Sequence, residues 1–322
     1  MASQVVNNAE KILQEAQNQQ RVIGSLKSGI KSRLIPGHEA TEQLFAKARI
    51  GFKTCDDISR AAVAGAKAAE VARNKKKYEF SAFEYSETAK LLEASNLELA
   101  LIYAEQAADH YQRTQSFENA EREYFSLGKM QEKAGYYDYA ISSYQSAIRI
   151  QQICRDARIY GPGDKRNSRL RYETRIQMCH TLFGRLDEAH LISDKYAAIF
   201  GNGDNFHEKS REKCFDYLIQ SCLLDLLINV KNFEEQIRRY ENWLPSFWLS
   251  TERKFIGELH KAVIAKNLGE YMSIIERYQC PESSVTVLIK TPQNGKNVKL
   301  PPKLKISENT IILLKLLSEK LQ

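Results

Sequence analysis

Proline and glycine are scarce in this sequence of 322 residues. It contains seven prolines and 15 glycines, and only Pro36, Pro162 and Pro245 fall before residue 281. A β-sandwich or barrel needs turn residues about every 8–12 positions. The shortage of both residues therefore excludes a chain built mainly of short strands and favours an all-α protein.

Long apolar runs and paired cysteines are also missing. The longest apolar stretch, Cys222 to Val230, contains Asp225 and Asn229 and is far shorter than the roughly 18–20 residues of a membrane span. The amino terminus lacks a basic segment followed by an apolar core, so we expect no secretory signal and no membrane insertion. Six cysteines occur without a C-x-x-C pair, which is typical of free thiols in a reducing compartment. We expect a cytoplasmic protein.

Motifs that carry catalysis or bind cofactors are absent. The sequence has no G-x-G-x-x-G, no G-x-x-x-x-G-K-[ST], no G-x-S-x-G and no H-E-x-x-H. The segment 201–205 resembles half of a calcium-binding loop but lacks the carboxylate that closes such a site. The six histidines are dispersed. We therefore expect no enzyme activity, no cofactor and no metal.

The net charge of +7 is concentrated in two segments. Residues 155–171 carry six basic and two acidic side chains, and residues 290–305 carry five lysines and no acid. The rest of the chain is nearly neutral, so the charge does not indicate a nucleic-acid-binding body. The segment 155–171 could meet an acidic protein surface, a lipid headgroup layer or nucleic acid, or it could simply be a solvated loop. The lysines of 290–305 suit a soluble linker or weak steering toward an acidic partner.

A helical repeat of the tetratricopeptide type begins at Glu121. In that frame of about 34 residues, Tyr124, Leu127 and Gly128 take the contact positions of a first helix, and Gly135 takes the turn. The second helix then places small and aromatic residues where the two helices approach closely: Ala140, Tyr144 and Ala147.

A second copy of the pattern begins at Leu170, 49 residues after Glu121. Gly184 occupies its turn, and Ala189, Ser193 and Tyr196 occupy its second helix. The 15 residues beyond one repeat match the length of a non-periodic insertion, 155–169. Looser small-residue faces lie upstream: Ala61, Ala64, Ala68 and Ala72, and then Ala100, Ala104 and Ala107.

The chain is therefore predicted to be all-α, a right-handed α-solenoid of tetratricopeptide-like helical hairpins with capping helices at its ends. Residues 1–35 form an amphipathic helix, 36–280 form the solenoid with its insertion at 155–169, and 307–322 form a last helix that Ser307 caps. Residues 281–306 are a basic, proline-containing linker or a weak hairpin. The helices are expected at these ranges: 3–33, 38–53, 57–73, 78–94, 97–113, 116–133, 137–153, 170–183, 186–200, 208–230, 233–243, 251–266, 269–278 and 307–322.

Two apolar features suggest contact with another protein. Aromatic and leucine side chains cluster around Pro245, where they either pack between repeats or form an exposed binding hot spot. Each terminal helix carries an apolar stripe, which either caps the array or docks into a partner's groove. The aromatic cluster consists of Tyr240, Trp243, Leu244, Phe247, Trp248 and Leu249.

Two end motifs resemble a known family. Ile30-Lys31-Ser32-Arg33-Leu34-Ile35, a proline, and then Glu39-Ala40-x-Glu42-Gln43-Leu44 is similar to the amino-terminal motif of the forty-kilodalton huntingtin-associated protein family, also called the factor VIII intron protein family. Ile306-Ser307-Glu308-Asn309-Thr310 and the leucine-rich residues after it resemble that family's closing helix. The chain lacks the long proline-rich insertion and the alanine-rich helices of members of that family. The soluble attachment proteins of the membrane-fusion ATPase are broader relatives with the same SNAP-like helical hairpins.

The resemblance implies a non-enzymatic scaffold that binds and stabilises huntingtin, a large helical-repeat protein, with a link to early endosomes and a Rab-type small GTPase and a possible presence in the nucleus. The alternative is an adaptor in SNARE disassembly and membrane fusion. No nucleic-acid partner is expected. The side chains expected to make or steer protein contacts are these: Leu26, Ile30, Arg33, Leu34, Arg155, Arg158, Lys165, Arg166, Arg169, Trp243, Trp248, Ile312 and Leu316.

Overall fold

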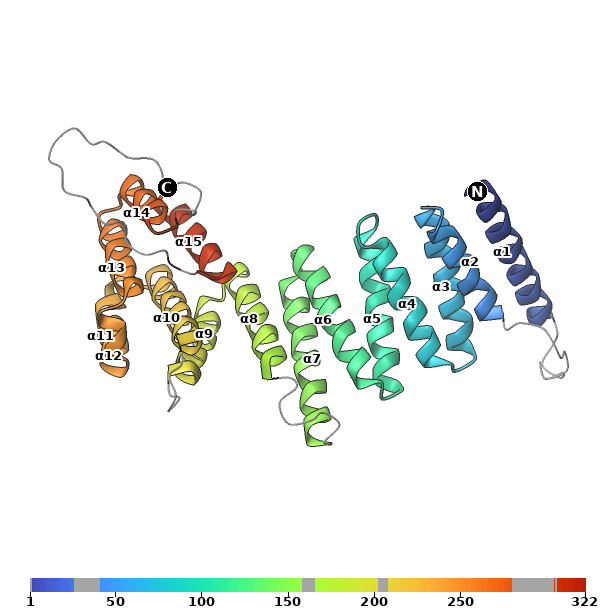
Figure 1. Ribbon diagram of the computed structural model, residues 1–322, viewed down its shortest axis with the longest axis horizontal. Coiled ribbons are helices and arrows are strands. Elements are labelled where there is room, and N and C mark those ends of the chain that lie inside the picture. Colours follow the sequence, from blue (N-terminus) through green and yellow to red (C-terminus); the bar gives the residue numbers. More distant parts are fainter. Residues whose placement is uncertain (1, 26–40, 158–165, 202–207, 280–303, 305) are drawn as a thin grey trace. The chain divides into compact units, whose positions relative to one another are not determined.

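A computed structural model describes residues 2–25, 41–157, 166–201, 208–279, 304 and 306–322 (Figure 1). Over these residues the chain consists of helices and the turns between them, without strands. Neighbouring helices pack in pairs. The predicted all-α, SNAP-like solenoid of helical hairpins is therefore confirmed.

The chain divides into two compact units, Met1–Arg175 and Ile176–Gln322. The boundary falls inside one helix, so the repeat array predicted over 36–280 is shared between both units. The helices of unit 1 are α1 (Ala2–Ser25), α2 (Thr41–Lys53), α3 (Ile58–Asn74), α4 (Tyr78–Leu92), α5 (Leu97–Arg113), α6 (Phe117–Lys133), α7 (Tyr137–Asp156) and the first part of α8 (Arg166–Leu182).

Unit 2 contains the rest of α8 and the helices that follow it. These are α9 (Leu186–Gly201), α10 (Glu208–Ile228), the 3₁₀ turn η2 (Val230–Asn232), α11 (Phe233–Trp243), α12 (Pro245–Trp248), α13 (Thr251–Ile264), α14 (Leu268–Gln279) and α15 (Glu308–Leu321). Helix α10 contacts α9, α11, α13 and α15. Its apolar residues include Leu218, Leu223 and Leu224, all fully buried. A helix covered on several sides needs apolar residues all round, which explains the apolar run that begins at Cys222.

One type of turn recurs between the helices. A residue with φ between 50° and 82° follows the last turn of the helix, and the next helix begins two residues later. Its amide donates to the carbonyl three residues back, and the next amide donates to the carbonyl five back, as at Gly135 and Tyr136. This is the hydrogen-bond pattern of a Schellman motif. The residues with positive φ are Asp56, Lys76, Gln115, Gly135, Gly184 and Lys266.

Small residues allow the helices of unit 1 to approach closely. Tyr144 on α7 is fully buried, and a Cβ atom added to Gly128 on α6 would lie 2.5 Å from its ring. Ala140 and Ala147 on either side are also fully buried. The repeat frame that begins at Glu121 is therefore confirmed by its packing. In the second copy of the pattern, Gly184 has a positive φ, and Ala189, Ser193 and Tyr196 are buried.

The predicted insertion at 155–169 is helical at both ends. Helix α7 continues to Asp156 and α8 already begins at Arg166, four residues before the predicted start. Apolar periodicity underestimates a helix whose first turn is polar, and α8 opens with Arg166, Asn167 and Ser168. The prediction of an irregular segment over 155–169 was wrong at these ends, and residues 158–165 lie outside the described residues.

The chain ends can be compared with prediction only in part. Helix α1 is described from Ala2 to Ser25, and residues 26–40 lie outside the described part. The predicted linker or hairpin of 281–306 also lies outside it, apart from Leu304 and Ile306. The last helix begins at Glu308, with Ser307 as its N-cap.

Candidate functional site

The described residues contain no arrangement typical of a metal centre. Among them, no group of three or more His, Cys, Asp or Glu side chains could hold a metal ion. No helix in this part of the chain is long and apolar enough to cross a membrane. The features of the described residues taken up below are surfaces and buried polar contacts.

The amino-terminal docking residues predicted from the sequence cannot be placed. Leu26, Ile30, Arg33 and Leu34 all lie outside the described residues. Glu42 from the same motif lies on α2 and is buried. Its carboxylate pairs with Lys75 at 2.6 Å and also with Lys77. Burial raises the pKa of Glu42, but these lysines outweigh burial and lower it overall. This part of the motif thus ties α2 to the turn between α3 and α4.

The basic segment is used partly for packing inside unit 1. Arg155 is exposed in the last turn of α7. Arg169 pairs with Glu173 at 2.8 Å, and the guanidinium of Arg171 lies 3.9 Å from the ring centroid of Phe125 on α6. Two of the six cations are therefore engaged within the chain. Arg158, Lys165 and the side chain of Arg166 lie outside the described residues.

The aromatic cluster around Pro245 contains both buried and exposed side chains. Tyr240 and Phe247 are buried, whereas Trp248 is 56% exposed and Leu249 is 81% exposed. Trp243 is half-buried against α9, where a Cβ atom at Gly201 would lie 2.7 Å from its ring. Part of the cluster therefore packs inside the unit and its end faces solvent, and binding of that exposed end to a partner stays a prediction.

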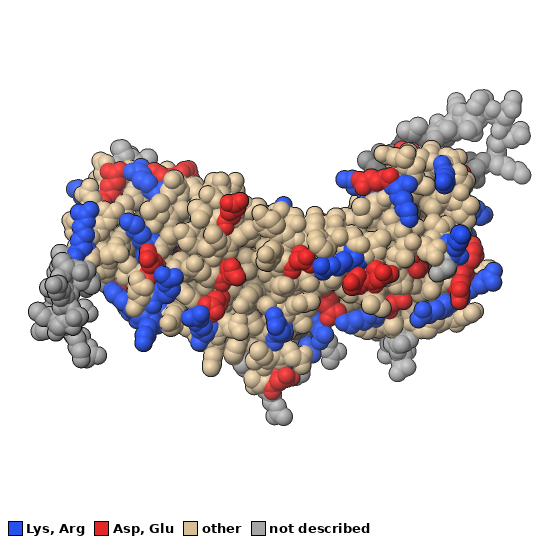
Figure 2. Space-filling view, turned by 180° about the vertical axis from the view of Figure 1, so that it is seen from behind, with Lys and Arg blue, Asp and Glu red and all other residues tan. Residues whose placement is uncertain are grey.

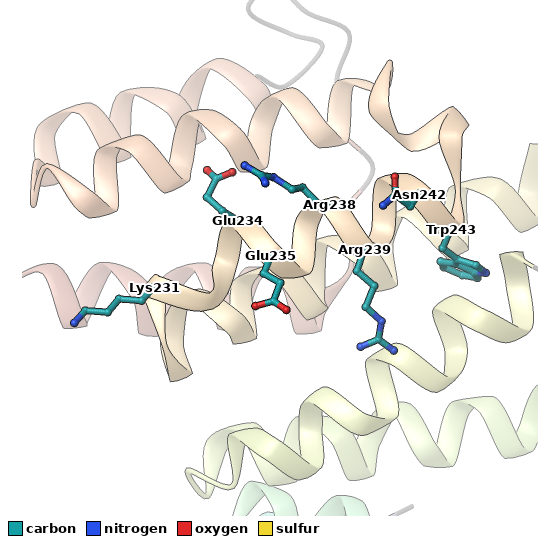
Figure 3. Close-up of a pocket in the computed structure, with 7 residues that line it drawn as sticks. All are labelled: Lys231, Glu234, Glu235, Arg238, Arg239, Asn242 and Trp243. Atoms are coloured by element: carbon teal, nitrogen blue, oxygen red, sulfur yellow. The ribbon is translucent and has the colours of Figure 1, made fainter.

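A depression of about 780 Å³ lies beside α11 and is lined by Lys231, Glu234, Glu235, Arg238, Arg239, Asn242 and Trp243 (Figure 3). In the figure Glu234 and Arg238 point to one side of α11, and Glu235 and Arg239 point to the other. Charges of both signs therefore share each side. An anion or cation site needs groups of one sign that converge, and this depression does not provide them.

Helix α15 is held in unit 2 by a network of buried polar side chains. Gln177 on α8 donates from Nε2 to Oε1 of Gln220 on α10 over 2.7 Å, and it accepts at Oε1 from Nδ2 of Asn309 over 3.2 Å. Thr310 donates from Oγ1 to Asp216 on α10 over 2.8 Å. Burial raises the pKa of Asp216, although hydrogen bonds from Thr310 and Ser307 oppose this rise. The Ser307–Thr310 motif thus fixes the start of α15 against α8 and α10.

The apolar stripe of α15 is used inside the same unit. Leu313, Leu314 and Leu317 are buried, and Tyr271 on α14 donates from its hydroxyl to the carbonyl of Leu314 over 2.7 Å. The predicted contact residues Ile312 and Leu316 are half-buried. Of the two roles considered for this helix, capping is present in the structure. Docking of Ile312 and Leu316 to a partner stays a prediction for the part of each side chain that remains exposed.

A groove of about 470 Å³ crosses unit 1 between α5 and α7, with α6 behind it. Its lining residues on α5 include Ile102, Glu105 and Asp109, and those on α7 include Tyr139 and Ser146. The sequence reasoning did not find this groove. Its residues repeat every three to four positions on two helices, but only the structure shows which of these faces remain uncovered.

Charges on the visible surface are mixed. Figure 2 shows acidic and basic side chains interspersed over one face of the molecule, with uncharged areas between them. Among the side chains that this view colours, neither sign of charge forms one continuous patch.

The family model of the soluble NSF attachment protein, SNAP, matches residues 1–152. This is somewhat less than half of the chain, and it lies entirely within unit 1. A search among curated proteins found no match. The chain is therefore similar to the SNAP family over its amino-terminal part. The match and the paired helices together describe a SNAP-like helical-repeat protein of the adaptor type.

Proposed function

We propose that this protein is a non-enzymatic scaffold or adaptor that binds and stabilises huntingtin, a large helical-repeat protein. The observation that carries the proposal is the SNAP-like array of helical hairpins in unit 1. Its buried polar side chains hold the helices to one another, and its outer faces keep exposed apolar side chains such as Phe83, Ile102 and Tyr139. Helical-repeat proteins commonly use such faces to bind other proteins.

The two end motifs support the finer proposal. Within the described residues, Glu42 of the first motif is clamped by two lysines, and Asn309 and Thr310 of the second fix α15. Motif residues that make buried contacts are required by the fold. Their similarity to the huntingtin-associated family therefore points to a shared architecture. The same resemblance suggests a cytoplasmic protein, with an association with early endosomes and a Rab-type GTPase and a possible presence in the nucleus.

An adaptor role in SNARE disassembly is the second candidate. One observation favours it, the match of residues 1–152 to the SNAP family model. Such an adaptor would bind a SNARE bundle and stimulate the fusion ATPase. We rank it second because the closing motif of the chain resembles the huntingtin-associated family.

Reconstitution with purified proteins separates the two candidates. The full chain is mixed with huntingtin in one experiment, and with a SNARE bundle and the fusion ATPase in another. We expect an equimolar complex with huntingtin by mass photometry and no stimulation of ATP hydrolysis in the second mixture. A complex with the SNARE bundle together with faster ATP hydrolysis, and no complex with huntingtin, would reverse the ranking.

The predicted docking residues provide variants for the same assay. Trp248→Ala removes an exposed aromatic side chain, and Arg155→Glu reverses an exposed charge. We expect Trp248→Ala to leave the association rate unchanged and to speed dissociation. Arg155→Glu should mainly slow association, because charges at the rim of an interface steer the encounter of the two proteins. Lys266→Glu, an exposed charge reversal in unit 2, serves as the matched control for Arg155→Glu.

A further inference from the structure

The groove between α5 and α7 in unit 1 is lined mainly by hydrogen-bond acceptors. Helices α5, α6 and α7 stand next to one another (Figure 1). Residues 102, 105, 106 and 109 of α5 line one wall, and residues 139, 142, 143 and 146 of α7 line the other. Each wall therefore shows the face of a helix over about two turns. The floor is formed by Tyr124, Leu127 and Gln131 of α6.

The hydroxyl protons of the three serines and of Tyr124 in this groove are already used in hydrogen bonds within the chain. Ser142 donates to the carbonyl of Asp138, and Ser146 donates to the carbonyl of Ser142. In the floor, Ser143 donates to Gln131 Oε1 over 2.7 Å, and Tyr124 donates to Gln112 Oε1 over 2.9 Å. A hydroxyl whose proton is used still offers its oxygen as an acceptor. An incoming group therefore meets oxygen lone pairs at these positions.

Three further acceptors lie on the α5 wall. Gln106 Oε1 is buried and has no hydrogen-bond partner among the described residues, and a buried acceptor left in this state costs roughly 1–3 kcal/mol. Glu105 is exposed, and no hydrogen bond or ion pair within the described part of the chain engages it. Asp109 pairs with Arg113 at 2.9 Å. Two carboxylates and no cation line the groove.

The carboxylates of the α5 wall affect the pKa of Tyr124 in the floor of the groove. Burial raises the pKa of Tyr124, and the charges of Asp109 and Glu105 raise it further. Arg149 opposes this rise from the α7 side, where it donates to Ser146 Oγ over 3.0 Å. The α5 wall therefore carries the carboxylates of Glu105 and Asp109, whereas Arg149 lies on the α7 side.

Two exposed apolar side chains lie on opposite walls of this groove, Ile102 on α5 and Tyr139 on α7. Ile102 is 48% exposed and Tyr139 is 68% exposed, although both line the groove. Large apolar side chains of a partner helix could cover both of them when the groove is occupied. The ring of Tyr139 can also attract a cation through its π face.

We propose that this groove binds a basic amphipathic helix of a partner protein, with large apolar side chains against Ile102 and Tyr139 and an arginine or lysine at Glu105 and Gln106. Charge complementarity selects this occupant, because the groove offers acceptors and negative charge to a donor-rich, cationic segment. A helix fits because two parallel helical walls present grooves of helical spacing. The inference deepens the proposed adaptor function and rests on it for its biological partner.

The test uses the full chain and two synthetic peptides. The probe is a fluorescent helical peptide of about 18 residues, long enough to be helical, with leucines on one face and arginines beside them. The second peptide replaces each arginine with glutamate. We expect the basic peptide to bind at least about tenfold more tightly than the acidic one in fluorescence anisotropy at about 0.15 M salt.

Groove variants then localise the binding. Glu105→Lys and Ile102→Ser change exposed side chains, so the fold should survive, and circular dichroism checks this. We expect each to weaken the basic peptide about tenfold. Glu70→Lys on α3 is the matched control, since Glu70 is exposed, lies outside the groove lining and undergoes the same change of charge; it should leave the affinity within about twofold.

Three outcomes would overturn the inference: equal binding of both peptides, an affinity unchanged by Glu105→Lys, or an equal loss in Glu70→Lys. Self-association of the chain that Ile102→Ser abolishes, without peptide binding, would also overturn it by making a second copy the occupant. Failure of the two proposals is distinguishable. If huntingtin binds but the peptide does not, only the groove proposal fails, whereas peptide binding without huntingtin leaves the groove and removes the named partner.

Discussion

Asn309 on α15 donates a hydrogen bond from Nδ2 to Oε1 of Gln177 on α8, over 3.2 Å and across 132 residues of sequence. Both side chains are buried. Gln177 also contacts Gln220 and Ser193, so α8, α9, α10 and α15 share one polar network. The start of the last helix is therefore fixed by specific hydrogen bonds as well as by its leucines.

Removal of this bond should weaken unit 2. In Asn309→Ala the Oε1 acceptor of Gln177 loses a partner in a buried place, which costs roughly 1–3 kcal/mol. We expect the urea midpoint of unfolding to fall accordingly. Glu319→Gln, on the exposed side of the same helix, should change the free energy of unfolding by less than about 0.5 kcal/mol. Equal stability of both variants would show that the network contributes nothing.

A buried ion pair links three helices in unit 1. Arg49 on α2 donates from Nε to Glu84 Oε2 on α4 over 2.7 Å, and from Nη2 to Glu84 Oε1 over 3.2 Å. The arginine passes Gly65 on α3, where an added Cβ atom would lie 2.7 Å from its Cδ. Burial raises the pKa of Glu84 even though Arg49 opposes this.

Replacing only one partner of this ion pair should lower the free energy of unfolding strongly. Glu84→Leu leaves the guanidinium of Arg49 buried without its main partner, and we expect a loss of about 3–5 kcal/mol. The double variant Arg49→Met, Glu84→Leu should recover most of that loss, because it leaves no buried charge. Chemical denaturation of the two variants measures the difference. A double variant as unstable as the single one would mean that packing, and not charge, explains the loss.

A single methyl group tests the close contact between α6 and α7. Gly128→Ala would place its Cβ 2.5 Å from the ring of the fully buried Tyr144, and overpacking of this kind typically costs about 1–3 kcal/mol. Gly269→Ala on α14 is the control, because its Cβ would meet only Oδ1 of Asn267 at 3.5 Å, an ordinary van der Waals contact. There the helix propensity of alanine should stabilise the chain by up to about 1 kcal/mol. Thermal unfolding should shift in opposite directions for the two variants.

Helix pairing could be predicted from the sequence because its causes are local. Gly128, Gly135 and Ala140 mark a close contact and a turn within about twenty residues of one another, and the structure confirms both. The contact of Asn309 with Gln177 could not be predicted, since polar partners so far apart leave no periodic signal. The start of α8 was missed because its first turn is polar.

The candidate groove could not be predicted from the sequence either. Ile102, Glu105 and Tyr139 look like ordinary surface positions of amphipathic helices in the sequence. Their importance depends on which faces remain uncovered and on which hydroxyl protons are already used inside the chain. Only the three-dimensional packing of α5, α6 and α7 determines both.

The stability of unit 2 should depend on pH through His190. Its Nε2 lies 3.0 Å from Asp225 Oδ1, and its Nδ1 lies 3.7 Å from Asp194 Oδ2. Burial lowers the pKa of His190, but these carboxylates outweigh burial and raise it above 6.5. Protonated His190 therefore stabilises the folded state fully below about pH 6.5, and this contribution is lost as the pH rises through the raised value.

In wild type the free energy of unfolding should decrease at and above neutral pH as His190 loses its proton. We expect this decrease to be absent in His190→Gln. His260→Gln is the control, because burial lowers the pKa of His260. Protonation of His260 therefore changes the stability only below about pH 6.5, outside the range in which His190 acts. The measurement is the free energy of unfolding at several pH values between about 6 and 8.5. If wild type and His190→Gln show parallel curves above neutral pH, the charged pair does not contribute.

In the proposed function this SNAP-like array is an adaptor that binds one large helical-repeat protein. Affinity purification of the tagged full chain from cytosol, washed at about 0.5 M salt to screen weak charge contacts, tests it most directly. The account predicts that huntingtin copurifies in equimolar amount, as judged by quantitative mass spectrometry. Recovery of the chain alone, or together with SNARE proteins and the fusion ATPase, would contradict it.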